Sequence, residues 1–332
     1  MPCRSPFRSG PTAPRFRIAG RSGTALLALL SCLLVSLLSP DHARSGIPAG
    51  IEVREPLRLP SRVAPERLAL DGLGRLFVLE RSGTRLLRLE PDSTWRAFGV
   101  GDQGGSRLAH LGSLFGKRGS DLFALDGRGG VLYRFDLDGH WETALSYRGA
   151  PGDASSEAVD FALSASGELL VVDRAGGRLL LFDRFGGFQA EVTAAGGGDR
   201  PLGPTRLALD DEGTAYLLDP AARTVRRYSR QGVALDAWRY DEGLMRGAGQ
   251  AACVDLLPNR TVALAAGDAS WLRLFSPDGV LLFHAEFPAW RGTRITDLVA
   301  FDDSLLYIAR PDQGEVARLA VHHADPTDPA RP

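Results

Sequence analysis

The sequence predicts an all-β fold, a six-bladed β-propeller built from four-stranded antiparallel blades. Two observations predict it. Residues 204–235 contain short runs of alternating apolar residues, separated by turns with Gly, Asp and Pro, which is the pattern of hairpin-linked strands. The same plan recurs along the chain at steps of 46, 47, 46, 46 and 45 residues. A unit of about four strands cannot bury both of its faces alone, so we expect the units to stack as blades.

The repeat is supported by three positions that follow one series of steps. A turn position is occupied by Gly74, Ser120, Gly167, Gly213, Asn259 and Ser304. The end of the second strand is occupied by Glu80, Asp126, Asp173, Asp219, Ala265 and Arg310. A third-strand position is occupied by Arg88, Arg134, Leu181, Arg227, Arg273 and Arg318. Because the three series agree, length changes fall between the repeats, and the regular arginines are expected to contact neighbouring blades.

The repeats resemble those of six-bladed propellers of the NHL-repeat type. The resemblance is carried by stretches such as RLALDGLGRLFVLERSGTRLLRLEPD at 67–92 and FALSASGELLVVDRAGGRLLLFDRFG at 161–186. It covers roughly residues 63–321 and implies the fold. It leaves the function open, because such propellers serve as enzymes, ligand-binding proteins and assembly scaffolds.

Residues 1–45 are predicted to form a signal peptide or an N-terminal anchor. Several arginines precede an apolar run at 24–38, which is short for a membrane-spanning helix. We therefore expect an exported protein that is periplasmic, secreted or anchored at the outer side of the inner membrane. Cleavage and retention of the segment both stay open. Cleavage would leave Cys253 as the only cysteine, so it would exclude an intramolecular disulfide, and Cys253 is expected to be a buried apolar side chain.

The propeller is predicted to span residues 46–321. Residues 51–59 alternate like a strand but precede the first full repeat, whereas the sixth repeat lacks an outer strand. We therefore predict that 51–59 supply that strand, close the ring and remove an exposed sheet edge. Residues 322–332, HHADPTDPARP, are predicted to be a disordered tail.

The composition limits the classes of partner. The chain is 44% hydrophobic and 24% charged with a net charge of −1, so no basic excess favours nucleic acid. Contact with a membrane is expected only through an uncleaved anchor. The expected partner is an unidentified protein or a small polar ligand, and the expected oligomeric state is a monomer.

The candidate ligand-binding residues lie where the repeats disagree. The connections between blades and the turns after the second strands share one face around the central channel, which is the default working surface. Two interpretations stay open for charged residues at its mouth: salt bridges between neighbouring blades, Asp297 with Arg67 and Asp160 with Arg206, or a pocket where the arginines clamp an anionic or sugar-like ligand. The position just before the first apolar residue of each inner strand is occupied by Arg67, Ser113, Asp160, Arg206, Ala252 and Asp297.

The acidic residues that end second strands are the candidate metal ligands. Several hard oxygens would suit Ca²⁺, so these residues could form a partial carboxylate ring. Each could instead accept hydrogen bonds from the backbone of its own turn, and this structural role is the one we expect. No cofactor is therefore expected, and Ca²⁺ stays as the alternative. The residues concerned are Glu80, Asp126, Asp173 and Asp219.

These observations predict an exported, non-catalytic binding or interaction propeller that uses the loop-rich face around the central channel. The sequence contains no GxSxG or HExxH motif, and no catalytic residue is identified. The alternative is a metal-dependent hydrolase resembling lactonases, or a lyase, with its site at the channel mouth. That alternative predicts three or more carboxylates or histidines within metal-binding reach of one another.

Overall fold

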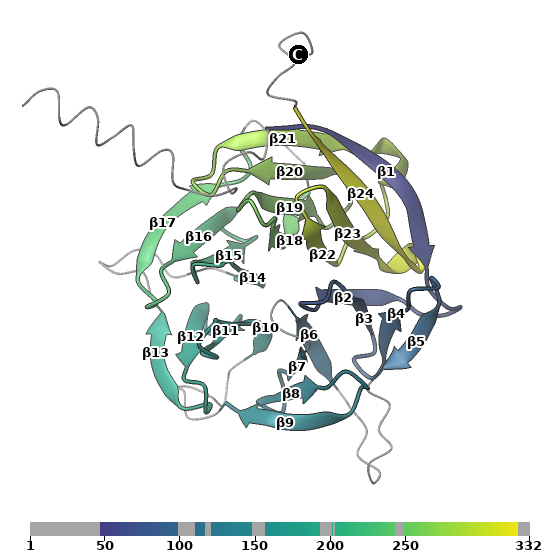
Figure 1. Ribbon diagram of the computed structural model, residues 1–332. Helices are drawn as coiled ribbons and strands as arrows, with labels where there is room; N and C mark the ends of the chain where they lie inside the picture. The colour runs from purple at the N-terminus through teal and green to yellow at the C-terminus, as the bar shows by residue number, and fades with distance from the viewer. Residues whose placement is uncertain are drawn as a thin grey trace, which may run out of the picture. The chain divides into compact units, whose positions relative to one another are not determined.

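The structure is a ring of six four-stranded sheets around a central channel. The computed structural model describes residues 47–98, 110–116, 121–147, 157–192, 201, 203–242 and 249–324, all within the compact unit Ser45–Pro332. Figure 1 shows the sheets following one another around the ring. The predicted all-β six-bladed propeller is confirmed.

Each sheet forms one blade, and the strands of each blade are named from the innermost outward. Blade 1 contains β2 (Pro65–Leu70), β3 (Leu76–Glu80), β4 (Leu86–Leu89) and β5 (Trp95–Phe98). Blade 2 contains β6 (Leu111–Phe115), β7 (Leu122–Asp126), β8 (Val131–Phe135) and β9 (Trp141–Ser146). Blade 3 contains β10 (Ala158–Leu163), β11 (Leu169–Asp173), β12 (Arg178–Phe182) and β13 (Phe188–Val192).

The remaining blades follow the same order. Blade 4 contains β14 (Arg206–Leu209), β15 (Ala215–Asp219), β16 (Thr224–Tyr228) and β17 (Ala234–Arg239). Blade 5 contains β18 (Ala251–Leu256), β19 (Val262–Ala266), β20 (Trp271–Phe275) and β21 (Leu281–Glu286). Blade 6 contains β22 (Asp297–Asp302), β23 (Leu305–Arg310), β24 (Glu315–His323) and β1 (Pro48–Arg58).

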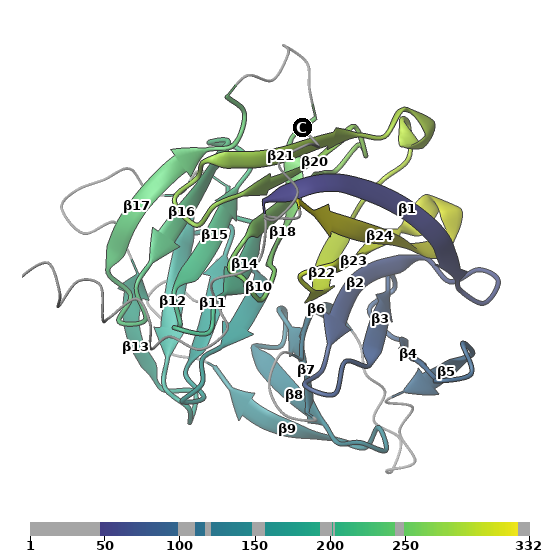
Figure 2. The same cartoon turned by 45° about the horizontal axis from the view of Figure 1, so that its top comes forward.

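The N-terminal strand belongs to the last blade. β1 pairs antiparallel with β24, with Ile51 opposite Val321 and Val53 opposite Leu319, and the sheet order is β1-β24-β23-β22. Figure 2 shows β1 running along the outer side of β24. β24 continues to His323, two residues beyond the predicted end of the propeller. That β1 stabilises the closed ring remains a prediction.

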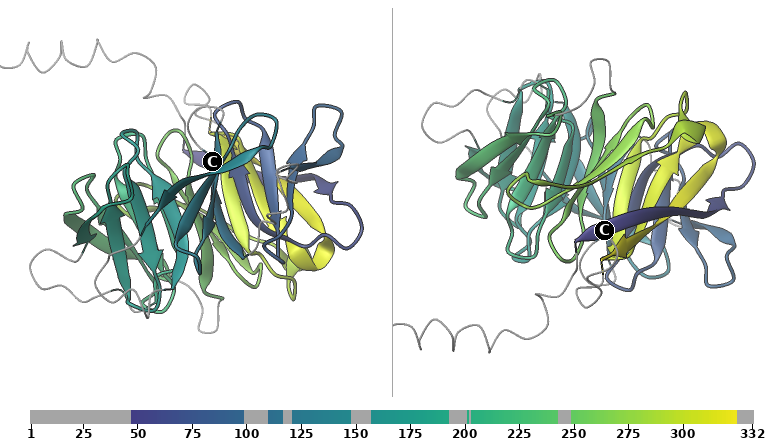
Figure 3. Two further views of the ribbon diagram at one scale, coloured as in Figure 1. Left: turned by 90° about the horizontal axis from the view of Figure 1, so that it is seen from below. Right: turned by 90° about the horizontal axis from the view of Figure 1, so that it is seen from above.

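The core lies between neighbouring blades, as the stacking argument requires. One apolar cluster joins Leu79 of blade 1 to Leu122 of blade 2, and another joins Leu218 of blade 4 to Leu264 of blade 5. Val316 of blade 6 is completely buried in a cluster with residues of blade 1. Figure 3 shows the blades standing side by side in the two edge-on views. Each blade therefore depends on its neighbours for burial of both faces.

Two of the regular arginines and one cysteine have the structural roles expected from the repeat, whereas Arg318 donates to Glu55 within its own blade. Arg88 donates from Nη1 to the carbonyl oxygen of Leu137 in the next blade at 2.9 Å. Arg227 makes the equivalent bond to Pro277 in the following blade at 2.9 Å. Cys253 is completely buried, and this burial raises the pKa of its thiol. These contacts confirm that the two arginines link blades and that Cys253 packs as a small apolar side chain.

The predictions of a signal peptide or anchor and of a disordered tail concern residues that the structure largely does not describe. The predicted signal peptide or anchor at 1–45 and residues 325–332 of the predicted tail lie outside the described residues. Within the described ranges, no helix has the length and apolar character needed to cross a bilayer.

Candidate functional site at the channel mouth

The connections between blades meet the turns after the second strands on one face of the ring. The N–H of Leu111, at the start of β6, donates to the carbonyl oxygen of Gly83 in the β3–β4 turn at 3.1 Å. The N–H of Ile295, before β22, donates to Gly267 in the β19–β20 turn at 3.0 Å. These contacts define what we call the loop face, where the inner strands begin. The mouth of the channel on this face is the loop-face mouth.

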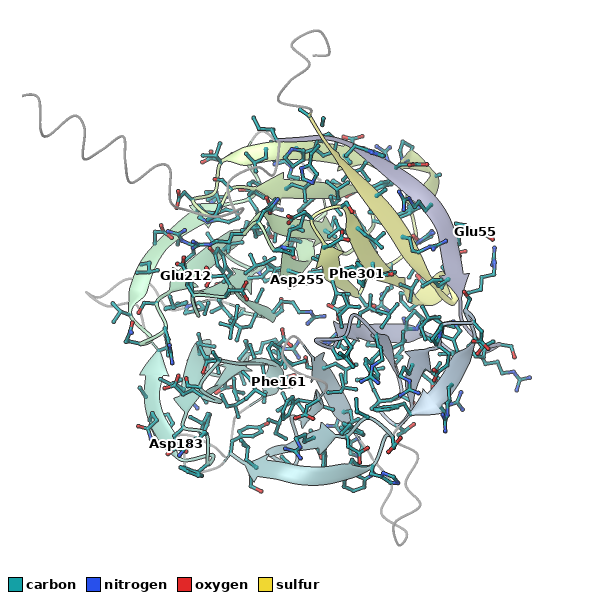
Figure 4. All side chains as sticks on the ribbon, in the orientation of Figure 1. Glu55, Phe161, Asp183, Glu212, Asp255 and Phe301 are labelled. Atoms are coloured by element: carbon teal, nitrogen blue, oxygen red, sulfur yellow. The ribbon has the colours of Figure 1, made fainter. Side chains whose placement is uncertain are left out.

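Inner strands carry polar side chains into the channel. Figure 4 shows Phe161 of β10 and Asp255 of β18 near the centre of the ring, whereas Glu55 and Asp183 lie at its periphery. The carboxylate of Asp255 accepts a hydrogen bond from the N–H of Ala300 in the next blade at 2.8 Å. An inner strand has no neighbouring strand on its channel side, so its N–H groups that face the channel need side-chain acceptors such as this one.

Two of the predicted site residues use the same device. Asp160 of β10 accepts hydrogen bonds from the N–H of Leu207 in blade 4 at 2.8 Å and from the hydroxyl of Ser113 in blade 2. Asp297 of β22 accepts one from the N–H of Leu68 in blade 1 at 2.8 Å. Asp160 therefore links blades 2, 3 and 4 around the channel, and Asp297 links blades 6 and 1.

The predicted ion pairs of Asp297 with Arg67 and of Asp160 with Arg206 do not form, although each carboxylate reaches the predicted neighbouring strand. The two carboxylates reach the predicted strands, but they bind the backbone N–H of the residue that follows each arginine rather than the guanidinium. In the described part of the chain, Asp297 instead lies 3.8 Å from Nε of Arg206, across the channel. The physical reason is that a free strand-edge N–H points at a fixed place, whereas a long arginine side chain can turn toward the mouth.

The two arginines project toward the loop-face mouth. Arg67 donates from Nη1 to the carbonyl oxygen of Glu66 at 3.1 Å. Arg206 donates from Nη1 to Thr205 and from Nη2 to Thr296, both at 2.9 Å. Their side chains are 12% and 13% exposed, respectively. The structure thus places both arginines at the mouth, and their role in ligand binding stays a prediction.

Their charges influence each other. Burial and, next, the positive charge of Arg206 lower the pKa of Arg67. Burial acts in the same direction on Arg206, but the carboxylates of Asp297 and Asp160 outweigh it and raise the pKa of Arg206. Nε of both arginines is buried and has no hydrogen-bond partner among the described residues. Two desolvated guanidinium groups with unused donors therefore face one space.

That space consists of two neighbouring hollows at the loop-face mouth, with volumes of about 520 and 380 Å³. Arg67, Arg206, Arg174 and Thr205 line both of them. Ala252 lines only the larger one, so this position leaves room rather than contributing a polar group. Volumes of this size suit a small ligand.

Several residues of the mouth were missed by sequence reasoning. Thr205 and Thr296 stand one residue before the predicted series, so extending that series by one position would have found them. Arg174 follows the second strand of blade 3 and pairs with Glu157 across the blade entrance. No repeat-wise signal marks Arg174, because the corresponding residue differs between blades.

The opposite mouth has a different character. A hollow of about 450 Å³ there is floored by apolar residues that include Leu70, Phe115 and Leu209. Its charged rim is paired internally, since Arg260 lies 3.0 Å from Asp210 and 2.9 Å from Glu212. Nε of Arg260 is also buried without a partner among the described residues, so the two mouths differ in the ion pairing of their arginines and not in the presence of an unpaired Nε.

The acidic series at the second-strand ends serves its own turns. Asp126 accepts hydrogen bonds from the N–H groups of Arg128 and Gly129 at 3.0 and 2.8 Å. Asp219 binds the N–H of Ala222 at 3.1 Å, and Asp173 binds Nε of Arg178 at 2.7 Å. Glu80 differs, because its carboxylate lies 3.4 Å from Arg85. These contacts fit the structural interpretation.

Among the described residues, candidate metal ligands gather in one exposed turn and not at the second-strand ends. Within the described ranges, three or more candidate ligand atoms lie within 4.8 Å of one another only at Asp136, Asp138 and His140. These residues are exposed in the β8–β9 turn, where Asp136 accepts hydrogen bonds from the N–H groups of Asp138 and His140, both at 2.9 Å. The four second-strand acids therefore do not form a Ca²⁺ cage with one another.

We expect Asp297 to make stability depend on pH. Burial raises its pKa to about 6, although Arg206, Arg67 and the Leu68 N–H oppose this and Asp160 adds to it. A pKa above the unfolded value of roughly 3.9 means that the folded state binds this proton more tightly. The stabilisation that protonated Asp297 gives to the folded state is therefore complete below about pH 4, and it is lost as pH rises through about 6.

The substitution Asp297→Asn tests this expectation, because asparagine does not titrate. The free energy of unfolding of the wild-type chain minus that of the variant should fall by on the order of 2 kcal/mol between pH 4 and pH 7. Urea unfolding at four pH values measures this difference. A difference that is constant or that grows with pH would contradict the assignment.

Comparisons with known proteins agree on the fold. No protein-family model matches the sequence, and no curated protein matches it. Among solved structures, a luciferin-regenerating enzyme is 13% identical with a TM-score of 0.60, over 83% of this chain and 98% of its own. A putative gluconolactonase is 16% identical with a TM-score of 0.59, over 84% and 94%. Virginiamycin B lyase from Staphylococcus aureus is 9% identical with a TM-score of 0.56, over 82% and 100%.

These similarities place the chain in one structural class. It is a six-bladed β-propeller whose structural neighbours include enzymes and a calcium-binding protein, regucalcin from Agrobacterium tumefaciens. At such low identity the likeness shows the fold alone. The NHL-repeat resemblance of the sequence stays a prediction.

Proposed function

We propose that the protein is an exported binding propeller that takes a small polar ligand at its loop-face mouth. The observation that carries the proposal is the convergence of side chains from blades 1 and 4, Arg67 and Arg206, on a hollow where their Nε groups have no partner in the described structure. Binding pockets typically place a few polar groups around a preformed concave space. We further propose that the exported protein acts as a monomer.

The arrangement favours binding over metal-dependent hydrolysis. Asp160 and Asp297 already accept hydrogen bonds from neighbouring inner strands. The other carboxylates that line the mouth also have partners: Glu66 lies 3.9 Å from Arg67 and accepts a hydrogen bond from Arg81, Glu157 pairs with Arg174, and Asp268 accepts one from Ser270. The side chains that keep unused capacity there are therefore cationic donors rather than the hard-oxygen ligands that a Ca²⁺ or Mg²⁺ ion needs.

The substitution Ala252→Trp tests the location of the site without changing any charge. Ala252 lines the larger hollow, and its side chain is only partly buried, so an indole at this position should occupy the space that a ligand needs. For small polar ligands found by thermal-shift screening of the wild-type chain, we expect A252W to weaken binding at least about 10-fold in calorimetry.

Two controls make this result interpretable. Ala165 lines the hollow at the opposite mouth, so Ala165→Trp should leave the affinity unchanged. Circular dichroism and the melting temperature show whether A252W remains folded. A folded A252W that binds every ligand with wild-type affinity would show that the larger hollow of the loop-face mouth is not the site.

A further inference from the structure

We propose that the group recognised at the loop-face mouth is an oxyanion, the carboxylate or phosphate of a small molecule, held between Arg67 and Arg206. This inference rests on the proposed function and adds the chemical class of the ligand. It follows from the donors that the two arginines leave unused, from the way the nearby carboxylates are occupied, and from the size of the hollow.

Both arginines keep unused donors. A guanidinium offers five N–H groups; among the described residues, Arg67 donates from Nη1 alone, while Arg206 donates from Nη1 and Nη2 to carbonyl oxygens. Nε of each arginine also has no hydrogen-bond partner in the described part of the chain, but it has almost no accessible surface. The donors left for a ligand in the hollow are therefore the remaining N–H groups of Nη1 and Nη2, whose hydrogen bonds to an anion are charge-assisted.

The charges of the two arginines repel each other. Arg67 and Arg206 come from β2 and β14 in opposite blades, and the charge of Arg206 acts unfavourably on Arg67. Two nearby carboxylates act against this repulsion while they are bound to other groups: Asp160 binds Leu207 and Ser113, and Asp297 binds Leu68 through one oxygen and lies 3.8 Å from Nε of Arg206 through the other. An anion between the guanidinium groups would face both positive charges at once.

The shape of the guanidinium group and the size of the hollows suit a carboxylate or phosphate. The planar fork of arginine matches the oxygens of carboxylate and phosphate, which favours these groups over a halide. We call the pair Arg67 and Arg206 the clamp. The hollows of about 520 and 380 Å³ are also lined by Arg174 and Thr205, so the rest of a small molecule has room beside the clamp. Carbonyl oxygens of Thr205 and Thr296 hold Arg206 in place, which prepares the clamp before binding.

The experiment uses the full chain and defined probes at constant ionic strength: inorganic phosphate, sulfate, succinate and gluconate, with chloride and glucose as comparisons. We expect at least one oxyanion to raise the melting temperature, whereas chloride and glucose do not. Phosphate and sulfate stabilising more than the carboxylates would indicate a phosphate ligand, and the reverse order would indicate a carboxylate ligand.

Variants assign the effect to the clamp. Arg67→Gln and Arg206→Gln should each weaken binding of the best probe about 10- to 100-fold, because a hydrogen bond to a charged group is lost. Arg294→Gln is the matched control, since Arg294 lines the same hollow but is exposed. We expect this control to change the affinity less than about 3-fold.

The outcomes separate this inference from the proposed function. No stabilisation of the wild-type chain by any of the four oxyanions would overturn the oxyanion assignment, as would equal affinities in wild type, R67Q and R206Q. If a ligand is lost in A252W but keeps its affinity in both arginine variants, the mouth remains the site and the oxyanion assignment is wrong. If oxyanion binding is lost in R67Q and R206Q but unchanged in A252W, the clamp stands and the ligand body lies outside the larger hollow.

Discussion

A chain that begins at residue 60, and so lacks β1, is expected to melt at least about 10 °C below a chain that begins at residue 47, a loss of about 4 kcal/mol or more. The deletion exposes apolar surface in the last blade, because Ile51 packs on the core between blades 5 and 6, and Leu57 and Leu59 pack on the core between blades 6 and 1. It also removes the carbonyl oxygens that accept hydrogen bonds from Trp95 Nε1 and Arg318 Nε. An unpaired β24 edge should in addition promote aggregation.

The measurement is thermal unfolding by circular dichroism, together with size-exclusion chromatography. Val53→Ser is the control for a side chain of the same strand, because Val53 is 48% exposed, and it should shift stability by less than about 1 kcal/mol. A synthetic peptide of residues 47–59 added in trans should restore part of the lost stability. Equal melting temperatures of the two chains would show that β1 does not stabilise the ring.

Asp160→Ala is expected to destabilise the propeller by about 3 kcal/mol, because it leaves two buried donors without an acceptor. These donors are the N–H of Leu207 and the hydroxyl of Ser113, which belong to the blades on either side of Asp160. The effect is large because the side chain joins three blades and both of its hydrogen bonds are buried.

Asp183→Ala is the matched control. Asp183 also accepts two hydrogen bonds, from the N–H groups of Phe185 and Gly187, but it is exposed at the periphery of the ring (Figure 4). Water can replace those bonds, so we expect a loss below about 1 kcal/mol. Asp160→Asn should lie between the two, because its amide oxygen still accepts one bond. Equal losses in D160A and D183A, measured by urea unfolding, would contradict the proposed role.

Repeat spacing also explains why the fold could be predicted and the contacts of the site could not. The 45- to 47-residue steps report blade stacking, since every blade solves the same burial problem with the same pattern. The residues that depart from the pattern, such as Arg67 and Asp297, were thereby located at the mouth. Their partners depend on distances across the channel, which a one-dimensional period does not contain.

The sequence by itself therefore determined the all-β architecture, the number of blades, and the positions that face the channel, because alternation and period act locally and between neighbours. Tertiary structure alone decided that Asp160 and Asp297 bind backbone N–H groups of adjacent strands and that Arg206 reaches across to Asp297. It also decided that Arg67 and Arg206 share one hollow with unused donors. The physical reason is that ring closure brings blades 1, 4 and 6 to a common centre, and only there do side chains from such distant segments meet.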